Sequence, residues 1–356
     1  MNIAGVGVVC ARGRGVAALR AALEQGWQPP REIEAPFLQG AQYPVYDVEA
    51  PVLADKTVLA KLRRASHFDK MATLAAWDAL QDSGVQPADP VSIGVIMSTA
   101  FGPHATTFSF LDGILDFGEA GVSPTAFSHS VHNAAASYIA QTAEIRGPTV
   151  TLTQFYFSFH EALRLADAWL QEGRCRYVLA GAVDELGTVM EYAVGQIGRI
   201  AADRKIRPFQ CSAQPVTVPG EGAAFLLLTR DPSARRYGTV ARVDSGVGMP
   251  GDGRADLELL DADGLAVDET VYGGAVRWDQ PVASYAPLFG GMMTGSAFHC
   301  AAAALMLQEQ VRFASPVPDN PRGLAVCTQT GPAVLRRIRC LKFNCRGGWA
   351  TVGLER

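Results

Sequence analysis

The chain has 356 residues, of which 48% are apolar and 19% charged, so it can bury a core large enough for two domains of ordinary size. A formal net charge of −4 excludes a strongly basic nucleic-acid-binding protein, and no apolar run approaches the ~20 residues that span a bilayer. Seven cysteines without a CxxC pair indicate reduced thiols rather than a disulfide framework or a zinc site.

Short β-rich segments alternate with helical segments, which is typical of a mixed α/β protein with parallel strands. The elements expected in chain order are a strand at Ile3–Val9, a helix at Val16–Gln25, a helix over Asp55–Ser83, a strand at Ser92–Met97, helices at Thr106–Phe117 and Val131–Glu144 with a turn at Ser123-Pro124 between them, a strand-helix-strand unit ending at Ala182, a loop rich in Arg, Pro and Gly, and strands at Gly222–Thr229 and Thr239–Gly246. Because a strand begins at Ile3, the N-terminus lacks the zones of a signal peptide, and we expect a cytoplasmic protein.

The most informative segment is a strand-to-helix elbow around Tyr156. Residues 147–156 form a short β-branched strand, and the apolar residues of the following helix, Phe159 to Gln171, recur at helical spacing. At such a turn the helix dipole and free N–H groups would lower the pKa of a thiol. A phenol, with an ordinary pKa of about 10, is a poor thioester nucleophile at neutral pH.

This elbow resembles the active-site elbow of β-ketoacyl synthases, in which the turn carries a nucleophilic cysteine. Three further segments resemble the family independently: the helix Arg64 to Gly84, the run Arg207-Pro208-Phe209 with Pro219 to Ala224, and the loop Phe343 to Gly348. The resemblance implies a thiolase-like α/β fold with two related halves, residues 1–238 and 239–356, in a layered αβαβα arrangement. The second half is short, and before Asp256 it lacks a helical layer that synthases carry.

The resemblance also implies that the catalytic set of the family is replaced. Tyr156 stands in the place of the cysteine, Asp263 and Gly291 stand in the places of the two histidines, and Ala286 stands in the place of the lysine. A carboxylate at position 263 would repel a developing enolate. We therefore expect no catalysis by this chain alone and no cofactor or metal, and a hydrogen bond between Tyr156 and Asp263 would close the former site.

Three histidines allow either a functional or a structural interpretation. His129 and His132 are three residues apart, which suggests either a metal pair or, more simply, a polar wall or dimer contact. His160 follows the elbow by one helical turn and either contacts Tyr156 or is a satisfied structural residue.

Two further pairings involve cysteines. His299 adjoins Cys300, but neighbours in a helix point about 100° apart and would not face each other. Cys211 and Cys345 are expected to be packed thiols rather than nucleophiles.

A synthase-like chain without its nucleophile resembles the chain-length factor of type II polyketide synthases. That resemblance implies a heterodimer with an active ketosynthase, served by an acyl carrier protein, in which the growing chain enters a tunnel at the interface. The candidate tunnel residues are Phe101, Phe108, Leu111, Leu115 and Ala126, with ordinary core packing as the alternative for each. An apolar wall suits a reduced or polyene chain. Many such factors carry glutamine at the elbow, whereas here Gln154 lies two residues before Tyr156.

Two other functions remain open at this point. The chain is either a thiolase-fold enzyme with altered chemistry, in which Tyr156, His160 or Asp263 acts on an acyl substrate, or a homodimeric module that binds an acyl chain. All three functions require an exposed apolar surface for dimerisation.

Overall fold

The main sheet runs through the whole molecule. A computed structural model describes the chain except for residues 35–41, 59, 86–89, 119–120, 197–198, 252, 267 and 278. In the described part, 11 strands form one mixed sheet, ordered β11-β10-β14-β15-β9-β1-β8-β7-β5-β6 with β2 beside β1. The strands are β1 Asn2–Cys10, β2 Gly13–Arg14, β3 Arg31–Glu34, β4 Gln42–Val45, β5 Ile93–Thr99, β6 Thr149–Thr153, β7 Tyr177–Asp184, β8 Gly222–Thr229, β9 Thr239–Val247, β10 Leu257–Leu260, β11 Val282–Ala283, β12 Val311–Arg312, β13 Gly331–Pro332, β14 Arg337–Phe343 and β15 Gly348–Glu355.

The sheet consists of two groups of strands that meet at one point. A single residue pair, Asn2 with Thr239, joins β1 to β9. The first group contains β6, β5, β7, β8 and β1, and the second contains β9, β15, β14, β10 and β11. The mixed α/β class expected from the sequence is thus confirmed, while the domain boundary between residues 238 and 239 stays a proposal.

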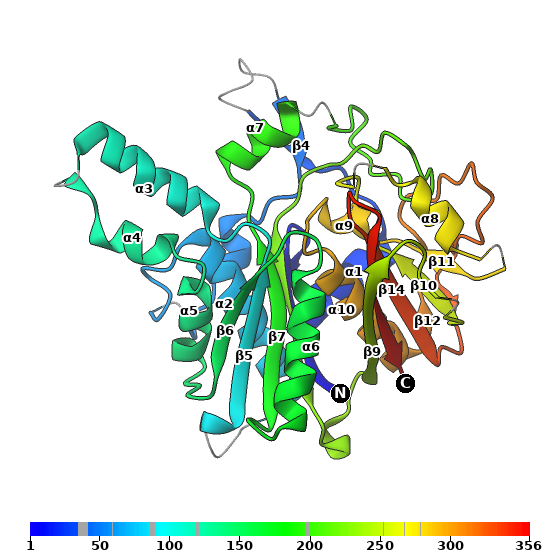
Figure 1. Ribbon diagram of the computed structural model, residues 1–356, viewed down its shortest axis with the longest axis horizontal. Helices are drawn as coiled ribbons and strands as arrows, with labels where there is room; N and C mark the ends of the chain where they lie inside the picture. The colour runs from blue at the N-terminus through cyan, green and yellow to red at the C-terminus, as the bar shows by residue number, and fades with distance from the viewer. Residues whose placement is uncertain are drawn as a thin grey trace.

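Helices lie between the two groups and outside the first (Figure 1). They are α1 Gly15–Gln25, α2 His67–Ser83, α3 His104–Phe117, α4 Pro124–Ser130, α5 Ala134–Thr142, α6 Ser158–Gln171, α7 Thr188–Gln196, α8 Thr270–Ala275, α9 Ala286–Phe289 and α10 Ser296–Glu309. Helix α10 contacts strands of both groups and is buried from Ser296 to Leu307, as expected for a helix that is apolar all round. Helices α2 and α5 cover the opposite face of the first group.

Three expected elements differ from the structure. The helix predicted from Asp55 begins only at His67, because Ser66 and Asp69 form a reciprocal capping box. The turn at Ser123-Pro124 is instead the start of α4, since Ser123 caps the helix and proline fits its first position. The segment after Ala182, expected to be a loop, contains α7.

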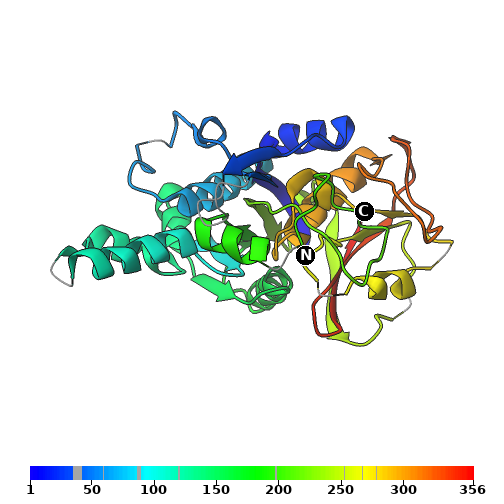
Figure 2. The ribbon, with the colours of Figure 1, turned by 90° about the horizontal axis from the view of Figure 1, so that it is seen from above.

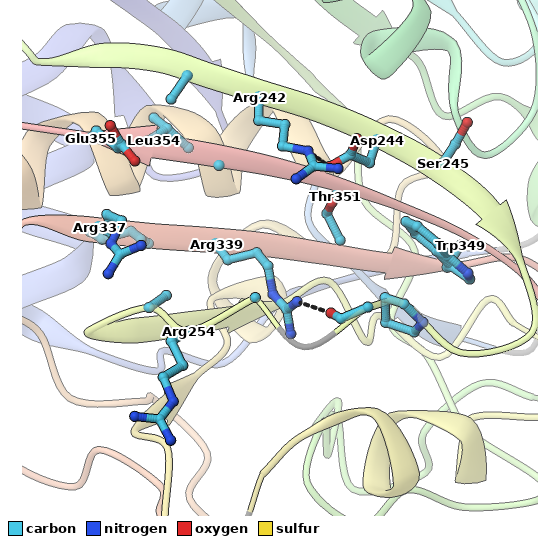
Figure 3. A pocket seen from close by; sticks show the side chains of 17 residues that line it. Arg242, Asp244, Ser245, Arg254, Arg337, Arg339, Trp349, Thr351, Leu354 and Glu355 are labelled. Carbon is cyan, nitrogen blue, oxygen red and sulfur yellow. Dashed lines mark hydrogen bonds and ion pairs between the residues drawn. The ribbon is translucent and has the colours of Figure 1, made fainter.

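The second group carries no helix over the outer face of β9, β15 and β14 in the described residues between β9 and β10. This face forms a hollow of about 680 Å³ lined by polar side chains such as Arg242, Arg337 and Arg339 (Figure 3). Arg339 binds Glu258 through two nitrogens at 2.9 Å and donates to the Gly251 carbonyl at 2.9 Å. In the described residues, this face of the sheet is therefore polar and open to solvent.

Helices α3 and α4 project from the body as an arm (Figures 1 and 2). Five large apolar side chains on the arm are exposed, and we call them the apolar arm: Phe108, Leu111, Leu115, Phe117 and Phe127. Leu115 is 82% exposed and Phe117 73%. A soluble monomer rarely leaves such a cluster uncovered, so the arm has the character of an interaction surface. Among the helices that the structure describes, none could cross a membrane.

Candidate functional site

Tyr156 lies in the elbow predicted from the sequence. Strand β6 ends at Thr153, the turn follows, and α6 begins at Ser158. The half-buried phenol donates a hydrogen bond to the Leu265 carbonyl at 3.4 Å rather than to Asp263, so the expected bond between these two side chains is wrong. Burial, with the nearby Cys345 thiol and Asp263, raises the pKa of Tyr156, so the phenol is neutral at physiological pH.

A cavity of about 470 Å³ opens beside the elbow, and we call it the vacated cavity. Its lining residues are Phe101, Tyr156, Asp184, Glu185, Leu186, Met190, Ala193, Arg199, Thr217, Pro219, Gly220, Gly264, Leu265, Gly291, Met292 and Met293. The structure thus brings Tyr156, Gly291 and the backbone next to Asp263 together at one place.

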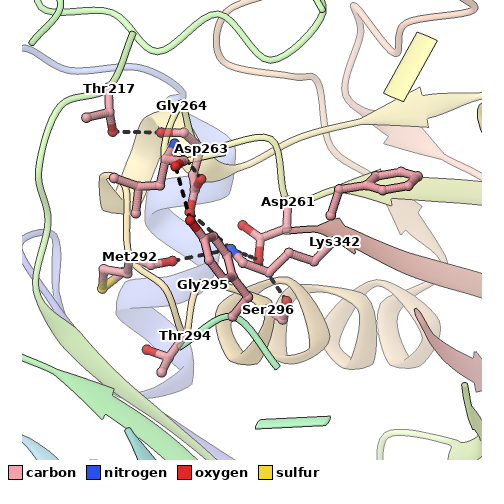
Figure 4. A network of polar contacts seen from close by, with 12 residues as sticks. Thr217, Asp261, Asp263, Gly264, Met292, Thr294, Gly295, Ser296 and Lys342 are labelled. Atoms are coloured by element: carbon pink, nitrogen blue, oxygen red, sulfur yellow. Dashed lines mark hydrogen bonds and ion pairs between the residues drawn. The ribbon is translucent and has the colours of Figure 1, made fainter. Parts of the chain in front are cut away.

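A buried ion cluster lies behind this cavity (Figure 4). The Lys342 ammonium donates to Asp261 Oδ2 at 2.8 Å and to Asp263 Oδ2 at 3.1 Å. Ser296 Oγ also donates to Asp261 Oδ2 at 2.7 Å. Lys342 reaches the cluster from β14, and Asp261 and Asp263 follow β10, so neighbouring parallel strands place the charges together.

The electrostatics of the cluster favour an internal ion pair. Burial alone would lower the pKa of Lys342, but the two carboxylates raise it above its ordinary value. Burial raises the pKa of Asp263 to about 6, and Asp261 acts in the same direction. For Asp261, the burial penalty is outweighed by Lys342 and His299, which together lower its pKa. A lysine held in this way offers no free cation to an enolate.

Gly291 and Ala286, the other two positions predicted to replace catalytic residues, have different surroundings. A Cβ atom added at Gly291 would lie 2.1 Å from Thr217 Oγ1 and 3.0 Å from the Asp263 carbonyl oxygen, so the Thr217 side chain and this carbonyl leave no room for a side chain unless Thr217 moves. Ala286 begins α9 and packs in a small apolar cluster with Tyr46 and Val218. It does not line the vacated cavity.

Two carboxyl groups line the opposite wall of the cavity. Asp184 accepts hydrogen bonds from Thr99 Oγ1, the Ala100 amide and the Thr294 amide at 2.8 to 3.1 Å. Glu185 accepts a hydrogen bond from the Ala105 amide at 2.9 Å. Burial, together with Glu221, raises the pKa of Glu185 to about 8, so this side chain is largely neutral at pH 7.

We expect stability to fall as the pH rises through about 8. The pKa of Glu185 is raised in the folded chain, so its contribution is fully present below the ordinary value of about 4.3 and is lost above the folded value. Burial also raises the pKa of Glu269 to about 8, so its contribution to stability is lost over the same pH range. Glu185→Gln should therefore remove part of the decrease in the free energy of unfolding, measured by urea titration, between about pH 5 and about pH 8. Glu34→Gln, at an exposed strand position, is the control, and an unchanged slope in Glu185→Gln would contradict the assignment.

Tyr156→Phe should have a small effect, because a 3.4 Å hydrogen bond is long. We expect a loss of less than about 1 kcal/mol in the free energy of unfolding. The matched control is Tyr272→Phe, since the buried Tyr272 hydroxyl donates to the Asp261 carbonyl at 2.7 Å and accepts from the Phe343 amide at 3.0 Å. We expect the free energy of unfolding of Tyr272→Phe to fall by about 1–3 kcal/mol. Equal losses in urea titrations would contradict this ranking.

The histidines take up structural positions. His160 is fully buried among Phe157 and Phe159, and no described group hydrogen bonds to either ring nitrogen. Burial lowers its pKa to about 3, so it is neutral, but it is not the satisfied residue expected from the sequence. His129 binds Asp69 at 2.9 Å and stacks on Tyr138.

The remaining pairings form no catalytic dyad. His299 Nδ1 lies 3.2 Å from the Gly295 carbonyl, and its Nε2 accepts from the Tyr285 amide at 3.2 Å. Its ring nitrogens are therefore engaged away from Cys300. Cys211 is buried as expected, but Cys345 is exposed, which corrects the expectation of a packed thiol. In the described residues, no three His, Cys, Asp or Glu side chains are grouped to hold a metal.

The candidate tunnel residues lie in two places. Phe101 lines the vacated cavity, and its ring contacts that of Phe155, with 5.3 Å between centroids. Phe108, Leu111 and Leu115 are exposed on α3, so the alternative that they are core residues of this chain is wrong. Ala126 is half-buried on α4.

Sequence reasoning missed Lys342. The available signal was a lone lysine within the apolar strand residues Cys340 to Phe343, whose charge must be paired if the strand is buried. Asp261 and Asp263, after another apolar strand, were the natural partners.

Comparison with known proteins gives the family. Residues 2–234 match the model of the β-ketoacyl synthase N-terminal domain. A spectinabilin polyketide synthase system protein from Streptomyces orinoci is 32% identical over 168 residues, which are 46% of this chain and only 4% of that protein.

Solved structures show the same fold over nearly the whole chain. A type II polyketide acyl-carrier protein complex with its ketosynthase bound to the hexaketide contains a chain with TM-score 0.82 and 17% identity, covering 99% of this chain and 98% of that one. The complex of ketosynthase ApeO with its chain length factor ApeC from Xenorhabdus doucetiae contains one with TM-score 0.78 and 16% identity, covering 99% and 97%. The large mixed sheet, the elbow and the family match over most of the chain lead to one conclusion: this protein belongs to the β-ketoacyl synthase family.

Proposed function

We propose that the chain is a chain-length factor: a non-catalytic subunit that pairs with an active ketosynthase and shapes the tunnel for its growing acyl chain. The observation that carries this proposal is the combination of an inactivated site with an exposed apolar arm. Tyr156 is a neutral phenol at the place of the nucleophile, and Lys342 is held between Asp261 and Asp263. Such a site supports no acyl transfer by the usual route of the family.

The proposed interface comprises the apolar arm and the open edge of the sheet. Strand β6 is the last strand of the first group and pairs with β5 on one side. Its residues are half-buried or exposed, and Phe155, which follows it, is 57% exposed. No described strand pairs with the other edge of β6, and such an edge next to apolar side chains is a natural place for a partner strand to pair. A related synthase subunit is the partner that best matches a surface of this kind.

In this proposal the partner's cysteine holds the acyl chain, and a carrier protein delivers the building blocks to the complex in the cytoplasm. Phe108, Leu111 and Leu115, with Ala126 nearby on α4, would form the wall that the chain meets after crossing the interface. Apolar side chains there favour a reduced or polyene chain, because the carbonyl groups of a poly-β-keto chain would lose hydrogen bonds to water. The similarity in fold to a chain of the solved complex of ketosynthase ApeO with its chain length factor ApeC supports this proposal.

The decisive experiment is gentle purification of the tagged chain from its native host, followed by native mass spectrometry. We expect a complex of one copy of this chain with one synthase that retains a cysteine and two histidines. A homodimer without such a partner would contradict the proposal and favour an acyl-binding module. Turnover of an acyl thioester by the purified chain alone would instead favour an enzyme with altered chemistry.

A further inference from the structure

We propose that the hollow on the outer face of β9, β15 and β14, which we call the basic groove, docks one α-helix of a protein partner. The helix would be amphipathic and would carry carboxylates on the side that meets the groove. The groove of about 680 Å³ lies on the second group of strands, whereas β6 belongs to the first. None of its described lining residues also lines the vacated cavity. The inference therefore stands apart from the proposed function.

The strands under the groove have one covered face and one open face (Figure 3). Along β14, Ile338 and Cys340 pack in the main core, whereas Arg337 and Arg339 alternate with them and line the groove. Helices α10 and α6 contact β14, β15 and β9 and contribute residues to that core. In the described residues between β9 and β10, no helix crosses the groove side. A sheet of this kind usually has a helix on each face, so one layer is open here.

The floor of the groove has the width of one helix. Strands β9, β15 and β14 are neighbours in the sheet, so the outer two lie roughly 10 Å apart. A helix with its side chains is about 10 Å across. At the centre of the floor, Gly353 of β15 pairs with Arg242 of β9 on one side and Arg339 of β14 on the other. A Cβ atom added at Gly353 would lie 3.8 Å from Arg242, its nearest neighbour, so the centre is a shallow trough between two arginines.

The charge of the groove is opposite to that of the chain as a whole. Four arginines and two carboxylates line the groove, whereas the chain has a net charge of −4. Two of these arginines, Arg242 and Arg339, already pair with carboxylates of this chain. Arg254 and Arg337 are exposed and form no ion pair with any residue in the part of the chain that the structure describes. Two guanidinium groups on one trough therefore favour a partner that brings carboxylates.

Apolar residues border the groove at one end. Trp349 lines it and is half-buried. Val247 and Met249, which are 85% and 57% exposed, lie in the chain between Ser245 and Pro250, two residues of the lining. A small anion would engage the arginines but leave these apolar side chains in water. An amphipathic helix with acidic and apolar residues side by side covers both kinds of surface.

The test measures fluorescence anisotropy of a fluorescein-labelled peptide added to the purified full-length chain. The peptide has about 14 residues, the length of α10, with glutamates on one helical face and leucines beside them. We expect it to bind, and the double variant Arg254→Glu, Arg337→Glu should raise its dissociation constant at least about tenfold. Arg63→Glu, Arg64→Glu makes the same change in net charge at exposed positions before α2 and should leave binding unchanged. Arg254→Gln, Arg337→Gln is the second variant if the charge reversal does not fold.

Two further peptides test the shape and the charge of the bound segment. A peptide of the same composition with a central proline should bind at least about tenfold more weakly, because proline breaks the helix. A peptide with lysines in place of the glutamates should not bind. Absence of binding by the acidic peptide, or equal binding by the proline peptide or by the folded groove variants, would overturn the inference. So would an equal loss in the Arg63 and Arg64 control, or displacement of the peptide by a short single-stranded oligonucleotide at lower concentration than by unlabelled peptide.

Discussion

Replacing Lys342 with methionine is expected to destabilise the folded chain by about 3–5 kcal/mol, because it leaves two buried carboxyl groups without their cation. The side chains of Lys342 and Asp261 are about 1% exposed and that of Asp263 about 4%, so all three charges are shielded from solvent. The variant should show a lower urea midpoint with an unchanged denaturant slope.

A triple variant distinguishes the effect of losing the charge of Lys342 from the effect of losing its side-chain shape. In the triple variant Lys342→Met, Asp261→Asn and Asp263→Asn, no buried charge of the cluster remains unpaired, and we expect recovery of a large part of the lost stability. Lys61→Met, at a side chain that is 45% exposed, should have almost no effect. If the triple variant is no more stable than Lys342→Met alone, shape rather than charge compensation is what the lysine supplies.

The double variant Leu115→Asp, Phe117→Asp is expected to weaken association with the partner synthase by at least about 100-fold. Both side chains are far more exposed than core residues, so the single chain should fold as before. At an interface, however, two carboxylates would replace apolar contacts and would be desolvated without partners. The measurement is the dissociation constant of the co-expressed pair, by analytical ultracentrifugation.

A matched control keeps this test specific. Val334→Asp changes an equally exposed apolar residue far from the arm in sequence and should leave the dissociation constant unchanged. A synthase that still binds the arm variant tightly would show that the arm does not form the interface. Unfolding of the arm variant alone would show that the arm is instead needed for the fold of the chain.

Much of the fold could be predicted because local signals and apolar patterning agree. Strand β8 has the bounds expected from its continuous apolar run, and the elbow at Tyr156 lies where a β-branched strand meets a helical repeat. The sequence pattern predicts a start of α2 that is too early, because helical periodicity continues through residues before the capping box at Ser66. The apolar periodicity identifies the helix, whereas the capping residues determine where it begins.

The site was harder to predict, because its contacts join segments far apart in the chain. The resemblance to β-ketoacyl synthases placed Tyr156 and Asp263 near each other, yet it did not reveal that Lys342 would take Asp263 as its partner. The hydrogen bond from Tyr156 goes to a backbone carbonyl, which carries no sequence signal. The exposure of Cys345 similarly depends on how the last loop lies against the elbow.

The close contact at Gly291 has an evolutionary consequence. A histidine there would have to displace Thr217, whose hydroxyl holds the carbonyl of Asp263, and that aspartate in turn binds Lys342. A side chain at position 291 would thus require coordinated changes in several segments, and the first change made alone would cost stability. Because these contacts depend on one another, single substitutions at Gly291 are disfavoured, and the proposed loss of a histidine there would be hard to reverse one residue at a time.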